Sequence, residues 1–392
     1  MDALTTPSNW QRVRLGDIGK PCMCKRVMKH QTTRHGEIPF YKIGTFGNTA
    51  DAFISKKLFL EYKTKYSFPK KGDILISASG TIGRAVIYDG KPAYFQDSNI
   101  VWIDNDETLV KNDFLFYAYS HVKWNTEHTT ILRLYNDNFR NTLIPLPPLN
   151  EQIAIANILS ALDRYLYSLD ALILKKESVK KALSFELLSQ RKRLKGFNQN
   201  WQKVRLGDIC EFGNGGAYET LIVENGDFKL ISLNSIDIDG NLKNTMKRVN
   251  FYDNSLKQDD IVMVLSDVAH GDFLGLCAVI PSNDYVLNQR MGRLRKKNDC
   301  INILFLRLYI NANQKYFKMQ GQGSSQLNLS KKAIEDFEIL LPPLDEQIAI
   351  ANILSALDNE IASLKNKKRQ FENIKKALNH DLMSAKIRVL KK

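Results

Sequence analysis

The sequence predicts an α/β (α+β) protein in which two strand-rich modules are separated by two long helices. The helices are expected to form an antiparallel coiled coil within a pseudo-two-fold internal repeat. Three observations lead to this prediction. Two sequence boxes each occur twice, the stretch after the second box has the apolar spacing of a coiled coil, and the stretches between boxes contain short apolar runs typical of strands.

The repeated boxes define the frame of the chain. The first reads NWQRVRLGDI at 9–18 and NWQKVRLGDI at 200–209, and the second reads LPPLNEQIAIANILSALD at 146–163 and LPPLDEQIAIANILSALD at 341–358. The copies are 191 residues apart for the first box and 195 for the second, and the sequences between them share little. The chain is therefore a tandem duplication that carries two diverged inserts, the first of which is four residues shorter.

A long helix is expected to begin after each LPPL segment. Consecutive prolines require extended backbone, which excludes a helix at that point. The copies differ only at Asn150 and Asp345, which are both favoured N-cap residues, and a glutamate follows each in the first turn, where the helix dipole favours negative charge. The first helix is predicted over about 150–194, a length of roughly 65–70 Å, and Gly196 is expected to end it.

Both helices carry apolar residues at alternating spacings of three and four, which is the pattern of a coiled-coil seam. A duplicated unit tends to pack with pseudo-two-fold symmetry, so we expect the helices to pair antiparallel. Each seam can instead meet a partner protein, and both arrangements are compatible because a helix has several faces. The predicted seam and partner-contact residues are Leu162, Leu169, Leu172, Val179, Leu183, Leu357, Leu364, Phe371, Ile374 and Leu378.

The frame divides the chain into four parts. We predict one recognition module over 1–145, a central long helix over 146–195, a second module over 196–340 and a C-terminal long helix over 341–392. The inserts proper, module 1 at about 19–145 and module 2 at about 210–340, contain runs that predict strands at 74–76, 85–88 and 99–103, and at 261–265 and 275–280. Matching element order with different loop residues indicates equivalent scaffolds with different recognition surfaces.

Charge and composition narrow the function classes. The net charge of +14 resides in 172–195 and 365–392, so the rest of the chain is neutral overall. Such basic segments fit contact with phosphates, or equally a solvated lysine-rich helix face. A polar N-terminus and the lack of any run near twenty apolar residues predict no membrane partner and a cytoplasmic location. The spacing of Cys22, Cys24, His30 and His35 is unusual for zinc and favours buried thiols and surface histidines.

Several loops carry side chains suited to reading bases, since arginine pairs with guanine edges and asparagine or glutamine with adenine edges. Any one of these residues can equally be a solvated loop residue. The predicted DNA-binding residues are Ser79, Thr81, Arg84, Gln96, Asn99 and Arg133 in module 1, and His270, Asn288, Gln289, Arg290, Arg293, Gln322, Ser324 and Gln326 in module 2.

The sequence offers little for catalysis. The only Pro-Pro pairs lie in the LPPL boxes, so the Asn/Asp-Pro-Pro-aromatic tetrapeptide of a DNA methyltransferase is missing, and no Walker A sequence occurs. Asp51, Glu61 and Lys63 make a loose nuclease-like set that has no counterpart in the second half. We predict no catalytic, cofactor-binding or metal-binding residues, which assigns any chemistry to a partner.

The duplicated LPPL-x-EQ-x-x-I box that opens a long helix, together with the WQ-x-VRLGDI box before each module, resembles the specificity (S) subunit of type I restriction–modification systems. The polar run at 321–329 that leads through Ile334 into LPPL is a further likeness in the second half, whereas the first half lacks the glycine-rich loop and has Asn138, Phe139 and Arg140 at that place. The resemblance covers essentially the whole chain.

The resemblance implies that each module is a target recognition domain for one half of a bipartite site in double-stranded DNA, and that the coiled coil sets the spacer. It implies two methyltransferase (M) subunits as partners, which use S-adenosylmethionine to methylate adenine N6. It also implies restriction (R) subunits that use ATP and Mg for cleavage. The alternatives are a two-module DNA-binding regulator and a protein-interaction scaffold, each acting without a methyltransferase; a stand-alone enzyme is disfavoured by the missing motifs.

Overall fold

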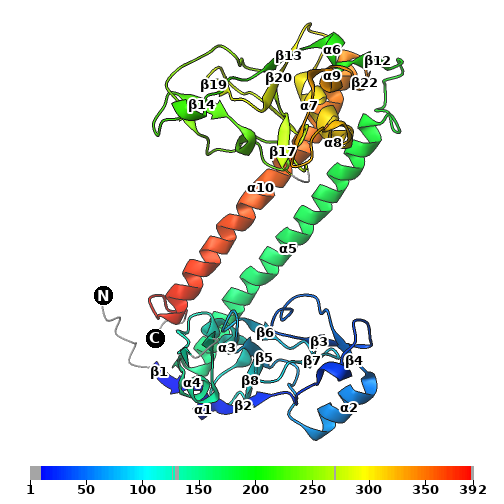
Figure 1. Cartoon of the computed structure of the whole chain (residues 1–392). Coiled ribbons are helices and arrows are strands. Elements are labelled where there is room, and N and C mark those ends of the chain that lie inside the picture. The colour runs from blue at the N-terminus through cyan, green and yellow to red at the C-terminus, as the bar shows by residue number, and fades with distance from the viewer. Residues whose placement is uncertain (1–9, 126, 129–131, 269–270, 390–392) are drawn as a thin grey trace. The chain divides into compact units, whose positions relative to one another are not determined.

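The computed structural model describes residues 10–125, 127–128, 132–268 and 271–389 and divides into two compact units (Figure 1). Unit 1 comprises Met1–Asp170 with Asn366–Lys392, and unit 2 comprises Ala171–Lys365. Each unit therefore contains one module together with part of each long helix.

The two repeated boxes meet in a small sheet at the base of each module. In unit 1, β1 (Gln11–Arg14) pairs antiparallel with β11 (Leu143–Leu146). In unit 2, β12 (Gln202–Arg205) pairs in the same way with β22 (Glu338–Leu341). The repeated residues are therefore strand partners from opposite ends of each module, which explains why both boxes are retained while the sequence between them diverges.

Module 1 contains a four-stranded sheet in the order β2-β8-β5-β6 and a three-stranded sheet in the order β4-β3-β7. The predicted strands are confirmed at β5, β6 and β8. The β2, β8, β5 and β6 strands pair antiparallel, and β3 pairs parallel with β7. The bounds are β2 (Gly19–Met23), β3 (Ile38–Tyr41), β4 (Phe53–Ile54), β5 (Ile74–Ser77), β6 (Ala85–Ile87), β7 (Tyr94–Phe95), β8 (Ile100–Asn105), β9 (Glu127–His128) and β10 (Leu132–Arg133).

Module 2 repeats this topology. Its four-stranded sheet has the order β13-β20-β16-β18, and its three-stranded sheet has the order β15-β14-β19 with β14 parallel to β19. The bounds are β13 (Cys210–Asn214), β14 (Phe228–Ile231), β15 (Arg248–Val249), β16 (Ile261–Val264), β17 (Ser266–Val268), β18 (Cys277–Val279), β19 (Tyr285–Leu287), β20 (Met291–Lys296) and β21 (Gln326–Asn328).

Short helices close each module around its sheets. They bury residues such as Phe114 and Phe139 in module 1, and Phe305 and Phe317 in module 2. Ser55 and Asn302 cap their helices by accepting a hydrogen bond from the third residue along. The helices are α1 (Leu15–Ile18), α2 (Lys56–Lys65), α3 (Asn112–Tyr119), α4 (Asn136–Asn141), α6 (Leu206–Ile209), α7 (Ile303–Ala312), α8 (Gln314–Gln320) and α9 (Lys331–Glu335); single 3-10 turns lie at Lys29–Gln31, Glu219–Leu221 and Leu233–Ser235.

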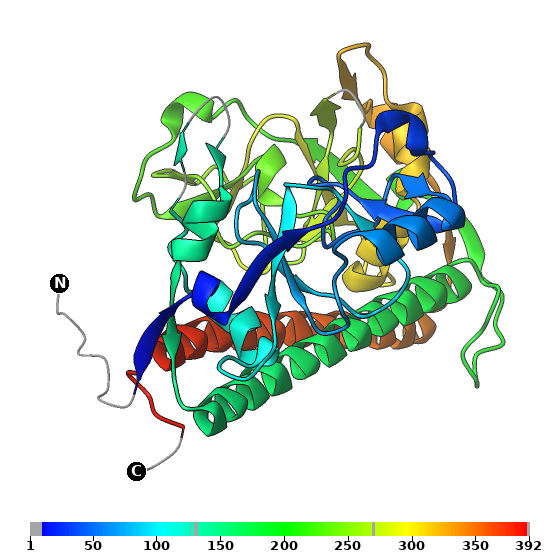
Figure 2. The same ribbon diagram turned by 90° about the horizontal axis from the view of Figure 1, so that it is seen from below.

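The long helices are α5 (Leu149–Leu188) and α10 (Leu344–Met383), each of 40 residues. Figures 1 and 2 both show them side by side and antiparallel. Both begin one residue before the predicted caps. The helix α5 ends at Leu188 rather than near 194, because Gln190 adopts a positive φ of 61° and the chain then turns back so that Arg193 reaches the start of α10.

The seam follows a strict alternation of four and three residues. In unit 1, Leu159, Leu162 and Leu169 of α5 face inward, and their equivalents Leu354, Leu357 and Leu364 lie on α10 in unit 2. Leu172, Val179 and Ile374 lie off the buried seam, at 37%, 40% and 49% exposed, so contact with a partner protein stays a prediction for these three. A helix with 3.6 residues per turn drifts against a seven-residue apolar repeat, so the buried face moves along the helix. The buried or half-buried positions in the second half of α5 include Ile173, Lys176, Lys180 and Leu183, and those on α10 include Phe371, Lys375 and Leu378.

The described residues meet the requirements of neither a membrane-spanning helix nor a metal site. The described helices include none that is long and apolar enough to cross a membrane. The described part of the chain also contains no group of three histidine, cysteine or acidic residues placed to hold a metal ion. Cys24 is buried, and burial raises the pKa of its thiol to about 12, whereas Cys300 is exposed.

Candidate nucleic-acid interface

Each module contains an equivalent polar junction, where three segments of that module meet. In module 1 the Ala78 N–H donates to the carbonyl oxygen of Asn99 at 2.8 Å, and the Leu134 N–H donates to that of Ala78 at 2.8 Å. In module 2 the Leu265 N–H donates to the carbonyl oxygen of Arg290 at 3.0 Å, and the Leu329 N–H donates to that of Leu265 at 2.8 Å. Identical backbone contacts make these segments structurally equivalent.

This equivalence assigns the side chains that surround each junction. Ser79 corresponds to Ser266, since Ser79 bridges Arg133 and Ser266 pairs with Asn328. Arg133 therefore corresponds to Asn328, and Asn99 corresponds to Arg290. Ser79, Asn99, Arg133 and Arg290 were predicted from the sequence, but Ser266 and Asn328 were missed. The offset of 195 residues from Arg133 leads directly to Asn328 and was the signal that identifies it.

The same equivalence locates the difference in length between the modules. The offset is 191 residues between Asn99 and Arg290 and 195 between Arg133 and Asn328. The net four extra residues of module 2 therefore lie between these points. The helix α8 occupies this stretch and has no counterpart in the described residues of module 1. The extra residues thus lie between two segments of the module 2 junction.

The side chains of the module 1 junction lie near the surface. The Ser79 hydroxyl donates to Oδ1 of Asn99 at 2.9 Å, and Arg133 Nη2 donates to the carbonyl oxygen of Ser98 at 3.0 Å. Asn99 and Arg133 are half-buried, while Ser79 is 9% exposed. The buried Ser79 hydroxyl thus fixes the orientation of the Asn99 amide, and the Ser98 carbonyl oxygen holds the Arg133 guanidinium beside it.

The remaining module 1 candidates belong to the loops beside this junction. Gln96 Oε1 accepts from the Ile43 N–H at 2.9 Å, and Arg84 Nη1 donates to the carbonyl oxygen of Phe46 at 3.0 Å. Both side chains therefore hold the 42–48 loop. Thr81 is exposed, and its carbonyl oxygen accepts from the Ser77 hydroxyl. Of these three, Thr81 and the remaining donors of Arg84 are available to a ligand.

In module 2, Asn288 is a structural residue rather than an available one. It is 1% exposed, its Oδ1 accepts from the Tyr218 N–H at 3.1 Å, and its Nδ2 donates to Glu219 at 2.7 Å. An amide that is buried and bonded at both its oxygen and its nitrogen is withdrawn from a base edge. The neighbouring Gln289 and Arg290 are exposed, and Arg290 adopts a positive φ of 68°.

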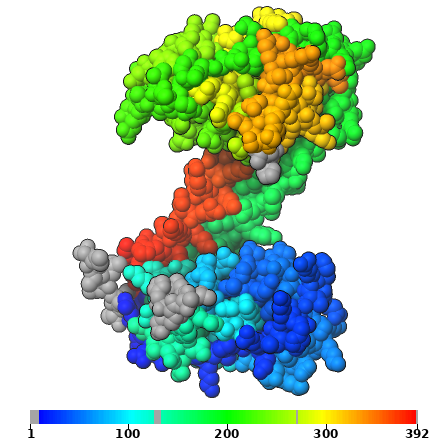
Figure 3. Space-filling view, in the orientation of Figure 1, coloured from blue at the N-terminus to red at the C-terminus, as the bar shows by residue number. Residues whose placement is uncertain are grey.

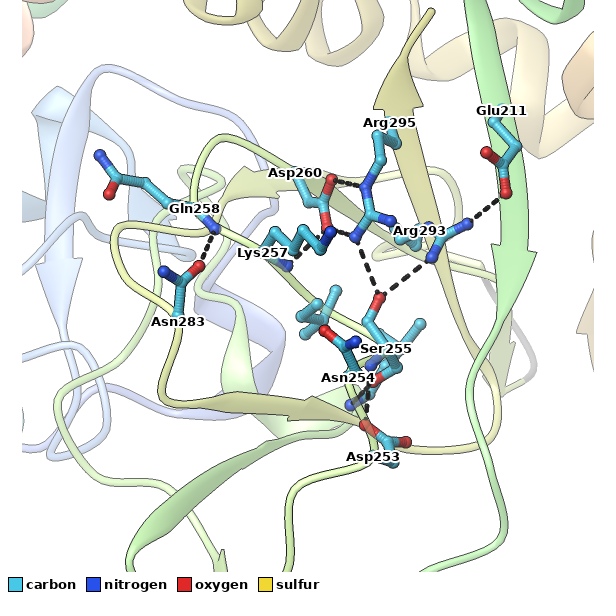
Figure 4. Close-up of polar contacts among 12 residues, drawn as sticks. Glu211, Asp253, Asn254, Ser255, Lys257, Gln258, Asp260, Asn283, Arg293 and Arg295 are labelled. Atoms are coloured by element: carbon cyan, nitrogen blue, oxygen red, sulfur yellow. Dashed lines mark hydrogen bonds and ion pairs between the residues drawn. The ribbon is translucent and has the colours of Figure 1, made fainter.

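Arg293 is likewise committed to the fold (Figure 4). Its Nη2 donates to Glu211 at 2.7 Å and its Nη1 donates to the Ser255 carbonyl oxygen at 3.2 Å. Beside it, Arg295 makes two hydrogen bonds to the buried carboxylate of Asp260, at 2.8 and 2.6 Å. These contacts fasten the 253–260 loop to β20, so the geometry disfavours a base-reading role for Arg293.

The glycine-rich segment of module 2 lies at the surface, as the orange region of unit 2 in Figure 3 shows. Gln322 and Ser324 are exposed, and Gln326 Nε2 donates to the Ser266 hydroxyl. Gln326 is thereby placed against the junction, whereas Gln322 and Ser324 lie on the neighbouring turn. The predicted contact at His270 falls outside the described residues.

The repeated glutamates at the helix starts are buried anchors. Glu151 is 2% exposed and accepts from Arg388 at 2.7 and 2.9 Å and from the Trp10 indole at 3.0 Å. In unit 2, Glu346 is 0% exposed and accepts from Arg193 at 2.8 and 2.6 Å and from the Trp201 indole at 2.9 Å. The two sets match residue for residue, so each unit contains the same Trp–Glu–Arg clamp.

The adjacent glutamines join each helix to its module. Gln152 accepts from the Lys111 N–H at 2.8 Å and donates to the carbonyl oxygens of Leu109 and Pro147. Gln347 makes the equivalent contacts with Asn302, Cys300 and Pro342. Every polar group of both amides is therefore used, which accounts for the EQ pair of the repeated box.

The comparisons with known proteins agree with these features. A family model described as the type I restriction modification DNA specificity domain matches residues 7–176 and, separately, 198–373. The MjaVIII type I restriction enzyme specificity subunit of Methanocaldococcus jannaschii is 29% identical, over 99% of this chain and 95% of that protein. A putative type I restriction enzyme specificity subunit of Haemophilus influenzae is 64% identical over 148 residues, which are 38% of each chain.

The crystal structure of the type I restriction–modification S subunit from M. genitalium has the same fold. It superposes with a TM-score of 0.66 at 19% sequence identity, and the match covers 98% of this chain and 99% of that one. The predicted fold class, with mixed α/β modules and two long helices that pack together, is thereby confirmed.

Proposed function

This chain belongs to the family of type I restriction–modification DNA specificity proteins, which are non-catalytic, and we propose that it directs a methyltransferase to a bipartite site in double-stranded DNA. Each module reads one half-site, and the length of helix between the modules sets the spacer. The observation that carries this proposal is that two diverged surfaces with equivalent polar junctions are mounted on a frame whose contacts are repeated residue for residue.

Exposed apolar residues of the repeated box support two identical protein partners. Ile153 and its equivalent Ile348 are 46% and 37% exposed, and Ile158 and Ile353 are both 37% exposed. Packing within the chain does not explain why these four isoleucines are the same in both copies. A surface that is apolar, exposed and identical in two places suits two copies of one partner. We propose that this partner is the methyltransferase (M) subunit.

The chemistry then lies in the partners. The M subunits use S-adenosylmethionine and flip a target adenine out of the duplex before methylating N6. Restriction (R) subunits that join the complex use ATP and Mg for cleavage. This chain supplies specificity, since each mismatched base pair costs roughly 1–3 kcal/mol and two half-sites multiply the discrimination. The complex acts in the cytoplasm, where it meets its DNA.

The test is to express the full chain with the methyltransferase subunit of its own system and to map adenine methylation across the host genome. We expect one split motif, with two short half-sites around a constant gap and one methylated adenine on each strand. A purified complex that methylates no defined sequence would contradict the proposal, and so would failure of the two proteins to associate.

The docking surface has its own test. Ile153→Glu and Ile348→Glu are each expected to weaken co-purification of the M subunit, because each places a charge in an apolar interface. Tyr167→Glu is the matched control, since Tyr167 is 78% exposed on α5 but its equivalent in the second copy is Ala362. Equal loss of the partner in all three variants would argue against a surface defined by the repeat.

A further inference from the structure

The equivalent junctions of the two modules hold the same three residue types in a different order. Asn99 of module 1 lies where module 2 has Arg290, and Arg133 lies where module 2 has Asn328. The serine is unchanged between the modules. Arginine and asparagine have therefore exchanged places between two segments of the chain that are far apart in sequence.

The serine contacts the asparagine in both modules, whichever segment carries it. The Ser79 hydroxyl donates to Asn99 Oδ1 at 2.9 Å, and the Ser266 hydroxyl donates to Asn328 Oδ1 at 2.7 Å. Ser266 is 2% exposed and Ser79 is 9% exposed, so neither hydroxyl is itself a surface group. Each serine fixes the orientation of an amide. Asn328 is exposed and Asn99 is half-buried, so both amides remain within reach of a ligand.

The arginines are also placed for a ligand. Arg290 is exposed, and none of the ion pairs between described residues includes it. Its φ of 68° is positive, a conformation that arginine seldom adopts, and such strain often accompanies function. Arg133 is half-buried, and its Nη2 donates to the Ser98 carbonyl oxygen. Each junction therefore presents one guanidinium and one oriented amide.

These two groups are the pair best suited to reading a G·C and an A·T base pair. Arginine donates two hydrogen bonds to guanine O6 and N7, whereas asparagine exchanges two with adenine N6 and N7. We propose that Asn99 with Arg133, and Asn328 with Arg290, read one adenine and one guanine in their half-sites, with Ser79 and Ser266 as positioning residues. The exchange of places then interchanges the adenine and guanine contacts between the half-sites. This inference rests on the proposed function.

The first test compares single variants of the full chain, each in complex with the methyltransferase subunit. Arg133→Ala is expected to relax one base pair of one half-site, with discrimination there falling about 5- to 150-fold, while the other half-site and the spacer stay unchanged. Arg290→Ala is expected to do the same in the other half-site. The readouts are the genomic methylation motif and methylation rates on duplexes that carry each base pair at the affected position.

Further variants separate base reading from phosphate contact and from folding. Arg133→Lys keeps the charge but loses the two-pronged contact, so it is expected to relax the guanine while retaining affinity. Ser79→Ala is expected to relax the adenine position and leave the guanine position intact, which a general packing defect would not do. Arg34→Ala, at an exposed arginine of the same module, is the control and is expected to leave the motif unchanged.

The double variant Asn99→Arg with Arg133→Asn reproduces the arrangement of module 2 in module 1. It is expected to interchange the adenine and guanine preferences of that half-site. If the wild-type complex methylates a split motif and both arginine-to-alanine variants retain that motif with unchanged rates, the base-reading roles proposed for the two junctions are wrong and the proposed function stands. If the wild-type complex recognises no sequence, the proposed function fails and the base-reading roles fail with it.

Discussion

The two units keep the same buried contacts where the long helices begin and differ at the midpoint of the coiled coil. Both units hold a buried glutamate between an arginine and a tryptophan, at positions that the repeat relates. Halfway along the coiled coil the same equivalence breaks down. In unit 1 the Tyr165 ring packs on Phe371 at 4.7 Å between centroids, and in unit 2 the equivalent Glu360 pairs with Lys176 at 2.8 Å.

This difference teaches which positions the architecture requires. The clamp is buried, so a change of one partner leaves the other unpaired away from water. The position halfway along the coil is half-exposed, so an aromatic pair and an ion pair both satisfy it. The Asp163–Lys375 and Lys180–Asp358 ion pairs on either side of it are retained in both units. The coil therefore keeps its register through these pairs.

The largest effect is expected from breaking a clamp. Glu346→Ala leaves Arg193 without its carboxylate and should lower the free energy of unfolding of unit 2 by roughly 3–5 kcal/mol. Glu151→Ala should lower that of unit 1 by a similar amount, because the contacts are the same. Thermal denaturation followed by circular dichroism measures both. Glu360→Ala is the control, since an exposed ion pair contributes at most about 1 kcal/mol. Clamp variants that melt like this control would show that the repeated glutamates are not structural.

A second comparison concerns equivalent buried aspartates in the modules. Asp260 is bound by Arg295. In module 1 the equivalent aspartate is Asp73, and Asp104 stands at the position equivalent to Arg295, so that a second negative charge replaces the guanidinium. Burial raises the pKa of Asp73 above its ordinary value. Asp260→Asn should therefore destabilise module 2 by about 2–3 kcal/mol, whereas Asp73→Asn should leave module 1 equally or more stable at pH 7, because the amide still accepts from the Lys70 N–H.

The sign follows from linkage. A carboxyl group whose pKa is raised in the folded state costs stability when ionised, and this cost disappears as the pH falls through the folded-state pKa. The advantage of Asp73→Asn over the wild type should therefore shrink on acidification. Urea denaturation of both proteins between pH 7 and pH 4 measures this difference. An advantage that grows as the pH falls would contradict the origin in burial.

The third prediction tests the tolerance of the coil at its midpoint. Phe371→Ala removes a half-buried ring and should cost about 1–2 kcal/mol. The double variant Tyr165→Glu with Phe371→Lys places the unit 2 pair in unit 1, and it should be more stable than either of its single variants. Melting temperatures of the wild type, the two single variants and the double variant give the coupling between the two positions. A double variant that is no better than its worse parent would show that the aromatic pair has a specific role.

The sequence predicted the frame because the frame is repeated. Identity between copies located the helix starts at 149 and 344, and the periods of two and of three to four located strands and seam. Leu172 and Val179 lie off the buried seam, because the drift of a helix against a seven-residue repeat moves the buried face by one position. Neighbours that are far away in sequence decide which of these helix positions are buried, and the local apolar pattern carries no information about those neighbours.

The site was harder to predict for the same reason. Arginine and asparagine in polar loops were identified, but Asn288 and Arg293 turned out to be held by Glu219 and Glu211. Nothing in the local sequence distinguishes them from Arg290 and Arg133. Ser266 becomes visible only when the backbone contacts of one module are superposed on those of the other, whereas the offset of 195 residues leads from Arg133 to Asn328 in the sequence itself. A duplicated chain thus supplies its own comparison once its pairing is known.

The smallest effect is expected at a contact that unit 1 has and unit 2 lacks. The rings of His121 and His380 lie 5.3 Å apart, and burial followed by the charge of His380 lowers the pKa of His121. The equivalent positions of unit 2 hold Ala312, 191 residues after His121, and Phe185, 195 residues before His380. Neither of these side chains titrates. A histidine with a lowered folded-state pKa binds its proton more weakly than the unfolded chain does, so stability is complete above about pH 6.5, the unfolded value. This stability is lost as the pH falls from there toward the folded-state pKa.

His121→Gln should therefore lose less stability than the wild type between pH 7.5 and pH 5.5, with His30→Gln, at an exposed histidine of the same unit, as the control. Equal losses in all three proteins would mean that the two rings are close without being coupled.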